Sequence, residues 1–299
     1  MGPTASGKTA LAIELAQALN GEVISVDSAL IYTHMDIGTA KPSIGEMQGV
    51  PHHLIDILSP QDTYSVADFL RDTEVCLQDI LSRGKLPILA GGTMMYFNAL
   101  VNGLNNLPAQ DIKIRQSIQA DIDDIGLINV HAKLAQVDPL TAAKIHPNDP
   151  QRTIRALEVY LSSGKNMSEW QSEQKSHANY NFVQFSIMPN DRSQLHEKIA
   201  QRFDQMLANG FIDEVQGLRK KFDLNEDLPS IRCVGYRQVW QHLEGMLNKD
   251  QMRERSIIAT RQLAKRQITW LRNWQNIIEM ESENDKNLAL VIEKVSASA

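Results

Sequence analysis

The sequence is poor in cysteine, with only Cys76 and Cys233 among its 299 residues. Two widely separated thiols cannot build a disulfide framework or a four-cysteine zinc site, and they favour a reducing compartment, so we expect a cytoplasmic protein. The chain also lacks an uninterrupted apolar run near the roughly 18 residues that a membrane span needs, and it does not begin like a signal peptide. No association with a membrane is expected.

An excess of positive charge is missing as well. The 30 Lys and Arg residues are outnumbered by 36 Asp and Glu, which gives a net charge of −6. Overall charge therefore does not attract nucleic acid, and such a partner would require a local basic patch. A composition with 42% hydrophobic and 22% charged residues excludes fibrous and disordered proteins, and the length allows one core with an insertion or two domains.

The most specific motif stands at the start of the chain. Residues 2–9 match the pattern G-x-x-x-x-G-K-[ST], and an apolar helical pattern over residues 10–19 follows. In such a phosphate loop, backbone N–H groups surround a phosphate, Lys8 adds a positive charge and Thr9 offers a hydroxyl to Mg²⁺. The residues expected to bind a polyphosphate are Gly2, Thr4, Ala5, Ser6, Gly7, Lys8 and Thr9, with Thr9 as the metal contact.

A buried strand normally leads into a phosphate loop. Here only Met1 precedes Gly2. We therefore expect that the natural chain has further apolar residues upstream, which form that strand.

Short apolar runs typical of strands occupy residues 22–26, 53–57, 86–90 and 182–188. Helical patterns over residues 66–83 and 94–101 alternate with them. This alternation predicts an α/β fold, a parallel sheet flanked by helices of the P-loop NTPase type. Because ligands collect at the carboxyl ends of parallel strands, the phosphate loop, Asp27 and Thr93 are expected at one edge of the sheet.

Consecutive amphipathic helices follow from about residue 104 and predict an all-helical insertion. Their patterns cover residues 112–125, 129–136, 139–145 and 150–163. The predicted domains are a core of residues 1–105 and 182–299 and an insertion of residues 106–181. Asn148 or Asp149 is the expected N-cap of a helix with Pro150 in its first position, so its opening turns contain Gln151, Arg152 and Arg155.

Further helices are expected over residues 193–209 and 212–222, and a last long helix supplies a basic patch. Residues 252–272 contain six basic residues and one acid, Glu254. At about 100° per residue, Arg261, Lys265 and Arg272 share one face. Apolar residues spread over the opposite half, namely Ile257, Leu263, Ala264, Ile268, Trp270, Leu271 and Trp274.

Two interpretations of this basic helix remain open. Exposed Lys and Arg are usual on any solvated helix face. The nearby Arg232 and Arg237, with Tyr236 able to stack on a base, instead favour a polyanion-binding surface.

Seven segments together resemble, in order, the signature motifs of the tRNA dimethylallyltransferase family, also called tRNA isopentenyltransferases. They are residues 2–9, 26–32, 36–42, 91–96, 146–152, 232–237 and 265–272. The resemblance extends from residue 2 to about residue 275. It implies transfer of a dimethylallyl group from dimethylallyl diphosphate to N6 of the adenosine 3′ of the anticodon, in tRNAs that read codons beginning with U. Mg²⁺ is the implied cofactor, and pyrophosphate is released.

The resemblance also implies roles for individual residues. Asp27 matches the catalytic base, Thr93 a threonine beside the reacting centre and Arg202 a clamp on the diphosphate. The residues alone leave alternatives open, since Asp27 could cap a strand end or bind a metal and Arg202 could form a surface ion pair. The implied tRNA contacts are Asp27, Ser28, Ala29, Leu30, Arg115, Gln151, Arg152, Arg155, Arg232, Cys233, Val234, Gly235, Tyr236, Arg237, Lys265, Arg266, Trp270 and Arg272. Leu30 departs from the family, in which many members have Gln.

The expected partners are the anticodon stem-loop of tRNA and dimethylallyl diphosphate. The insertion is expected to close over the stem, and the protein is expected to be a monomer. The phosphate loop alone would favour a different enzyme, an ATP-dependent kinase of a small metabolite or nucleotide. A nucleotide-gated RNA-binding module without chemistry is a third possibility, because it would keep the basic helix but would not need Asp27 or Thr93.

Overall fold

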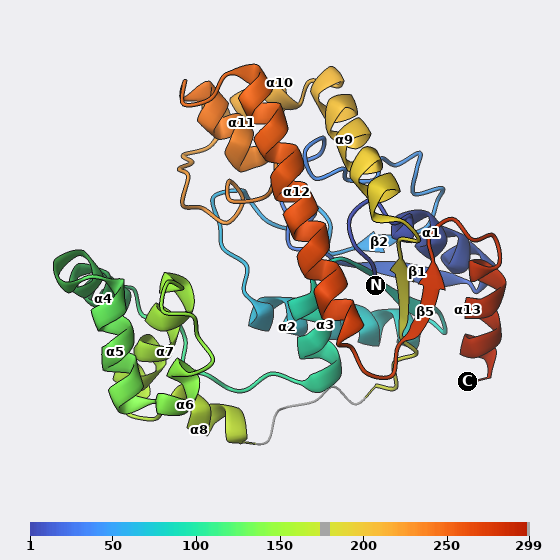
Figure 1. Cartoon of the computed structure of the whole chain (residues 1–299). Coiled ribbons are helices and arrows are strands. Elements are labelled where there is room, and N and C mark those ends of the chain that lie inside the picture. The colour runs from blue at the N-terminus through green and yellow to red at the C-terminus, as the bar shows by residue number, and fades with distance from the viewer. Residues whose placement is uncertain (174–179, 298–299) are drawn as a thin grey trace. The chain divides into compact units, whose positions relative to one another are not determined.

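The computed structural model describes residues 1–173 and 180–297, which form two compact units (Figure 1). The first unit comprises residues 1–99 and 180–299, and the second comprises residues 100–179. Residues 174–179, which the sequence analysis assigned to the insertion, lie outside the described residues. No helix within the described ranges is long and apolar enough to cross a membrane.

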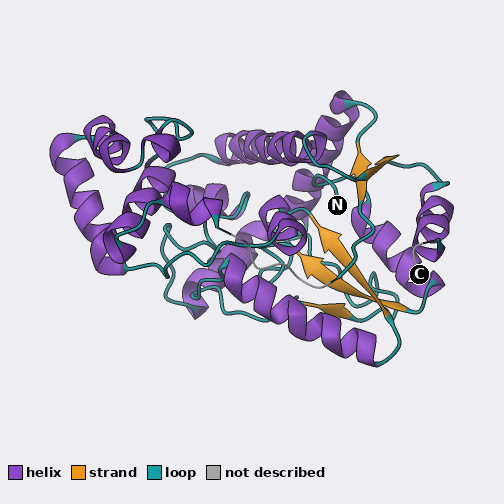
Figure 2. Ribbon diagram, turned by 90° about the horizontal axis from the view of Figure 1, so that it is seen from below, coloured by secondary structure: helices purple, strands orange, loops and turns teal. Residues whose placement is uncertain are grey.

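The first unit has a three-stranded parallel sheet in the order β2-β1-β3 (Figure 2). Its elements, up to the connection into the second unit, are α1 (Lys8–Ala18), β1 (Gly21–Val26), β2 (His52–His53), α2 (Val66–Ser82), β3 (Leu86–Gly91) and α3 (Met94–Asn102). Every residue of β1 is buried. Because successive side chains of a strand point to opposite faces, both faces of this central strand are covered, as in an α/β sheet flanked by helices. The expected fold class is confirmed.

A second, two-stranded parallel sheet pairs β4 with β5. The rest of the first unit consists of β4 (Phe185–Met188), α9 (Arg192–Ala208), α10 (Phe211–Lys221), α11 (Tyr236–Leu243), α12 (Lys249–Arg272), β5 (Ile278–Glu281) and α13 (Asn287–Ser296). The backbone before the phosphate loop runs beside β4, since Ile187 N donates to Met1 O over 2.9 Å. Helix α12 packs on α9 and α11.

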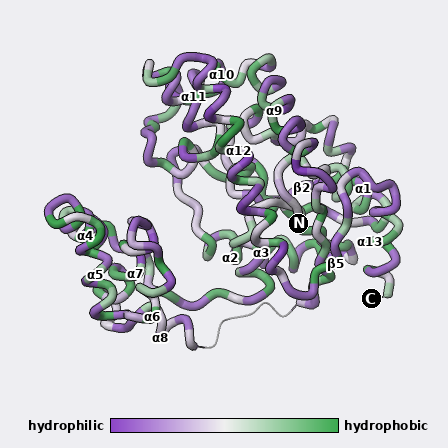
Figure 3. The backbone as a smooth tube through the Cα atoms, in the orientation of Figure 1, coloured by the Kyte–Doolittle hydropathy of each residue, from purple (hydrophilic) through white to green (hydrophobic). Residues whose placement is uncertain are grey.

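Two apolar clusters hold the first unit together. One joins α1 to strands of both sheets through Ile13, Val23, Ile88, Ile187 and Met280. The other is built mainly from α9 to α12 and the segment after β1. Hydrophilic and hydrophobic residues alternate along α9 and α12 in Figure 3, as expected of helices that bury one side.

The second unit is all-helical and has its own apolar core. Its helices are α4 (Ile112–Ile125), α5 (Leu127–Val137), α6 (Pro139–Ala142), α7 (Pro150–Ser163) and α8 (Met167–Ser172). Ile118, Val130, Leu134 and Val159 are among its buried residues. Asp149 caps α7 by accepting from Arg152 N over 3.0 Å, and Pro150 occupies the first position, as the sequence indicated.

Several expected elements differ in extent. The strand expected over residues 53–57 is only β2, because Leu54 and Asp56 have φ values of 59° and 56°, which an extended strand does not allow. Helix α6 ends at Ala142, where i→i−3 turns replace the helix expected to reach residue 145. The strand β4 begins three residues later than expected, and neither β5 nor α13 was anticipated.

Candidate active site

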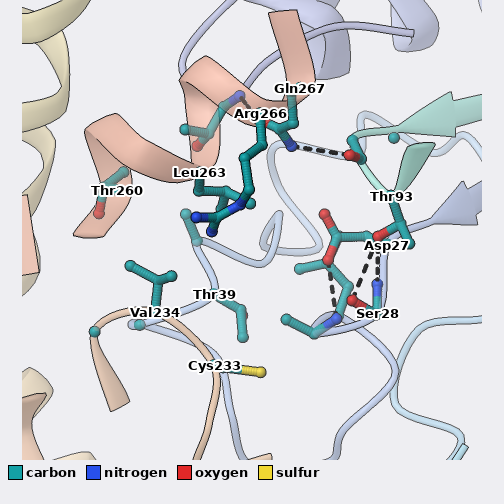
Figure 4. A pocket seen from close by; sticks show the side chains of 18 of the residues that line it. Asp27, Ser28, Thr39, Thr93, Cys233, Val234, Thr260, Leu263, Arg266 and Gln267 are labelled. Carbon is teal, nitrogen blue, oxygen red and sulfur yellow. Dashed lines mark hydrogen bonds between the residues drawn. The ribbon is translucent and has the colours of Figure 1, made fainter. Parts of the chain in front are cut away.

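A cavity of about 580 Å³ in the first unit brings the main candidate residues together. Its walls come from the phosphate loop, the ends of β1 and β3, the segment 38–40, α9, the segment 229–236 and α12 (Figure 4). The predicted site residues that line it are Thr4, Lys8, Thr9, Asp27, Ser28, Ala29, Leu30, Thr93, Arg202, Arg232, Cys233, Val234, Gly235, Tyr236, Arg266 and Trp270. The edge of the sheet that the strand pattern indicated is therefore one wall of this cavity.

The phosphate loop has the backbone of an anion-binding turn. Ala5 and Gly7 both have positive φ values, 61° and 85°, on either side of Ser6. Alternation of this kind turns successive N–H groups to one side, and the N-terminus of α1 begins directly after Gly7. Thr4, Lys8 and Thr9 line the cavity, whereas Gly2, Ala5, Ser6 and Gly7 do not.

Two half-buried cations, Lys8 and Arg202, line the cavity together with Asp27 and interact electrostatically with its carboxylate. Burial lowers the pKa of Lys8 to about 8; Asp27 opposes this shift and Arg202 adds to it. Burial likewise lowers the pKa of Arg202, while Asp27 and Glu46 act in the opposite direction. Arg202 has no ion pair among the described residues, so the surface ion pair considered from the sequence is not formed. Lys8 donates to Pro3 O over 3.3 Å, and neither cation is paired with a carboxylate among the described residues, so both charges are suited to an anionic ligand.

Asp27 and Thr93 stand on adjacent strand ends and are tied to each other through Ser28. Ser28 N donates to Thr93 Oγ1 over 3.0 Å, and Ala29 N donates to Asp27 Oδ1 over 2.9 Å. The close approach of the two strands requires Gly91, because a Cβ there would lie 2.0 Å from Val26 O. One carboxylate oxygen of Asp27 thus closes a local turn, and the other has no hydrogen bond to the described residues.

Glu214 on α10 holds the segment that leads into the cavity-lining residues 38–40. Its carboxylate accepts from the backbone N–H groups of Asp36, Ile37 and Gly38 over 2.9, 2.7 and 3.2 Å. It also accepts from the Tyr236 hydroxyl over 2.6 Å. The segment 36–42 has no assigned task in the sequence analysis; its residues 38–40 line the cavity, and Glu214 holds their backbone in place.

Tyr236 does not offer its ring to a base. The side chain is completely buried, and its ring packs edge-on against Phe211 at 4.9 Å between centroids. Burial, together with Glu214, raises the pKa of its hydroxyl well above the usual value. The stacking role expected for Tyr236 is therefore wrong, and an aromatic surface at the cavity comes instead from Trp270, which is 42% exposed.

Helix α12 presents three kinds of surface. Ile257, Ala264, Ile268 and Leu271 are buried, as expected. Leu263 and Trp270, which the sequence placed in the packed half, line the cavity instead. Arg266 extends from α12 into the cavity (Figure 4). Lys265 and Arg272 are exposed but lie outside the cavity lining, as does Arg237.

The basic residues predicted in the helical unit divide into two groups. Arg115 and Arg155 both bind the buried Glu158, with Arg115 Nε and Arg155 Nη1 at 2.9 and 2.7 Å from its oxygens. Burial alone would raise the pKa of Glu158, but these hydrogen bonds outweigh it and lower the pKa. Gln151 and Arg152 are exposed, and Arg152 has 73% of its side chain accessible.

Gln267 is a site residue that the sequence analysis did not single out. It lies within the segment 265–272, is 7% exposed, and lines the cavity. A polar residue within the apolar stripe of α12 was the available signal. Cys233 also lines the cavity; burial, aided by Asp27, raises the pKa of its thiol to about 12.

The oxygen donors present fit a Mg²⁺ ion that is held mainly by phosphate. Thr9 and Asp27 line the same cavity. The described residues form no cluster of three or more His, Cys, Asp or Glu that could bind a metal alone. Mg²⁺ commonly takes few protein ligands and completes its shell with phosphate oxygens and water, so this sparse donor set is compatible with it.

A phosphate-loop motif, a strand-end carboxylate and two half-buried cations around one cavity are typical of the class of P-loop-type folds with a site suited to a phosphorylated ligand. Comparison with known proteins narrows this class. The sequence model of the IPP transferase family matches residues 30–274. The chain belongs to the IPP transferase family and is a transferase.

Solved structures of tRNA-modifying enzymes resemble the whole chain. The tRNA isopentenylpyrophosphate transferase of Bacillus halodurans is 37% identical with a TM-score of 0.73, covering 99% of this chain and 94% of its own. The tRNA isopentenylpyrophosphate transferase of Staphylococcus epidermidis is 34% identical with a TM-score of 0.68, covering 100% and 96%. A eukaryotic dimethylallyltransferase acting on tRNA is 27% identical with a TM-score of 0.78, covering 99% and 78%.

Proposed function

We propose that this enzyme transfers a dimethylallyl group from dimethylallyl diphosphate to N6 of the adenosine 3′ of the anticodon, in tRNAs that read codons beginning with U. Family membership supports tRNA prenylation. The observation that favours this chemistry most is that the phosphate loop and Asp27 line one cavity. A cavity of about 580 Å³ is in the range of sites that enclose a small ligand. The enzyme is proposed to act as a cytoplasmic monomer.

The phosphate loop and the two half-buried cations bind the diphosphate. Thr4, Lys8 and Thr9 line the cavity on the loop side, and Arg202 reaches it from α9. As the bond between the prenyl carbon and the diphosphate oxygen breaks, negative charge collects on the pyrophosphate. Lys8 and Arg202 stabilise that charge in a partly desolvated place, where electrostatic interactions are strong.

Mg²⁺ would be held by the hydroxyl of Thr9 together with the diphosphate. When bound, it would neutralise part of the charge of the leaving group. Thr9 lies at the start of α1, beside Lys8, and both line the cavity.

Asp27 acts as the general base toward the attacking amine. The lone pair of the exocyclic N6 is delocalised into the adenine ring, so a carboxylate that accepts an N6 proton makes it a better nucleophile. The new bond joins N6 to the prenyl carbon, the electron pair of the broken C–O bond leaves with pyrophosphate, and Asp27 takes the proton. Thr93 fixes the turn that holds Asp27, through its bond from Ser28 N.

The target adenosine must leave the stacked anticodon loop to reach this cavity. Trp270 and Arg266 line the cavity and are exposed, and we propose that they meet the extruded nucleotide or its neighbours. Lys265 and Arg272 on the same helix are proposed phosphate contacts. Gln151 and Arg152 are proposed contacts of the helical unit, which is proposed as a tRNA-contacting domain.

The ATP-dependent kinase is not favoured by the family to which the chain belongs. A direct test incubates unmodified tRNA with either dimethylallyl diphosphate or ATP, and then identifies the nucleosides by mass spectrometry. Prenylated adenosine with the first substrate and none with the second is the expected result. Phosphoryl transfer from ATP to a small acceptor, without prenylation, would overturn the proposal, and tRNA binding without either product would indicate a binding module.

A further inference from the structure

The side-chain amide of Gln267 joins three separate parts of the site. Its Oε1 accepts from Thr4 N over 2.9 Å, and its Nε2 donates to Gly92 O over 2.9 Å. Figure 4 shows Gln267 reaching from α12 toward the end of β3. The residue is 7% exposed, so water does not compete strongly for either bond.

The fit around this amide is tight. A Cβ added to Gly92 would lie 2.4 Å from Gln267 Nε2 and 3.4 Å from Gly2 O. Gly92 has no positive φ value, so it is the approach of the amide that disfavours a side chain there. The phosphate loop, the end of β3 and α12 thus meet at one point.

Further contacts connect Gly92 to the carboxylate of Asp27. Gly92 is followed by Thr93, whose hydroxyl accepts from Ser28 N, and Asp27 directly precedes Ser28. A path of hydrogen bonds and covalent neighbours therefore leads from the phosphate loop through Gln267 to Asp27. Gln267 also follows Arg266, which extends into the cavity from the same helix turn.

We propose that Gln267 is a positioning residue that holds the phosphate loop and the Gly92–Thr93 segment at a fixed separation. This inference rests on the proposed function: a diphosphate bound by the loop must stand in line with an amine beside Asp27, and small errors of placement cost rate. The two bonds need both ends of the amide, because Thr4 N requires an acceptor and Gly92 O requires a donor. The same residue aligns α12 with both.

The first test compares Gln267→Met with Gln262→Met. Gln262 is an exposed residue of the same helix and serves as the matched control. With tRNA and dimethylallyl diphosphate, Q267M is expected to lower kcat about 10- to 100-fold while the Kd for tRNA changes less than threefold. Q262M should leave kcat, Kd and the thermal midpoint unchanged. A Q267M enzyme that loses thermal stability but keeps kcat within twofold would overturn the proposal, since the amide would then be structural only.

Gly92→Ala provides a second route to the same contact. It should displace the amide and reproduce the loss of kcat, and the double variant G92A/Q267M should be no slower than the slower single variant. Multiplying effects would show that the two residues act independently and would contradict the inference.

Binding of inorganic pyrophosphate separates this inference from the proposed function. Q267M should weaken pyrophosphate binding about tenfold, and Q262M should not change it. If the unaltered enzyme prenylates no tRNA, the proposed function fails, yet the pyrophosphate measurement still decides whether Gln267 positions the loop. Equal pyrophosphate affinities of Q267M and the unaltered enzyme would overturn the positioning role.

Discussion

The hydroxyl of Tyr236 donates a hydrogen bond to Glu214 Oε1 over 2.6 Å, and this contact joins two walls of the cavity. The same carboxylate accepts from three consecutive N–H groups of the segment 36–38. Gly38 must be small here, because a Cβ would lie 2.1 Å from the Phe211 ring. The hydroxyl of Tyr236 thus supports the carboxylate that holds the backbone of the segment 36–38.

Replacing Glu214 with Gln should destabilise the protein. The amide can accept with only one oxygen, and its NH₂ group would face backbone donors. Leaving such donors unsatisfied costs about 1 to 3 kcal/mol. The free energy of unfolding from urea titration should therefore fall by that amount. Asp213→Asn, an exposed carboxylate in the same first turn of α10, is the control and should change it by less than about 0.5 kcal/mol. Equal values for both variants would contradict the role of Glu214.

Asp27→Asn should reduce turnover about 10²- to 10⁴-fold, as expected for loss of a general base. The amide oxygen can still accept from Ala29 N, so the turn at the end of β1 is preserved. Single-turnover rates and the Kd for tRNA measured on the same preparation separate the two effects. Turnover that stays within threefold of the unaltered enzyme would remove Asp27 from the chemical step.

The sequence was sufficient for the parts of the fold that depend on local patterns. Helix α7 has the predicted bounds because its N-cap, its proline and its apolar period lie within the helix itself. The strand β5 was missed because four residues, Ile278–Glu281, gain their order from pairing with β4 nearly a hundred residues earlier. Such long-range pairing leaves no local signal beyond a short alternation.

The same distinction applies to the site. The phosphate loop is read directly from residues 2–9, whereas the tasks of Glu214 and Gln267 depend on which distant backbone groups they meet. The sequence predicts that Tyr236 contacts RNA, because the residues that bury its ring and bind its hydroxyl, Phe211 and Glu214, are more than twenty positions away and leave no local signal. Residue type and spacing indicated where the site is, but not which polar groups build it and which remain available to a ligand.

The buried carboxylate of Glu22 should make the fold sensitive to acid. It is 2% exposed and binds Arg83, Lys85 and His53. Hydrogen bonds from Arg83 foremost, with those from Lys85 and His53, outweigh burial and hold its pKa well below the ordinary value of 4.5. Because the folded pKa is depressed, Glu22 contributes stability above about pH 4.5, and this contribution is lost as pH falls below that value.

Glu22→Gln tests this pH dependence. The difference in unfolding free energy between the unaltered protein and E22Q should be largest near pH 7 and should shrink as the pH is lowered from about 4.5. Glu14→Gln, at an exposed position of α1, should show no such trend. A difference that is independent of pH would mean that Glu22 is not held ionised by its partners.

Lys265→Ala should weaken tRNA binding and reduce the slope of log K against log salt concentration by about one, as expected for a lost phosphate contact. Lys265 is exposed and has no ion pair among the described residues. Arg253→Ala is the control on the same helix, because Arg253 binds Asp204 over 2.6 and 2.7 Å. A slope that is the same for K265A and the unaltered enzyme would assign this face of α12 to solvent.

Arg152 and Arg155 lie in the opening turns of the same helix, and their surroundings differ. Arg155 binds the buried Glu158 and also donates to Pro108 O over 2.7 Å, whereas Arg152 is mostly exposed. Arg155→Ala should lower the stability of the protein by about 1 to 3 kcal/mol, because Glu158 keeps only Arg115 as its cationic partner. Arg152→Ala should leave the unfolding midpoint unchanged and weaken tRNA binding in a salt-dependent way. Unfolding curves and tRNA titrations of both variants measure these two effects. A loss of stability confined to R152A would contradict the structural role of Arg155.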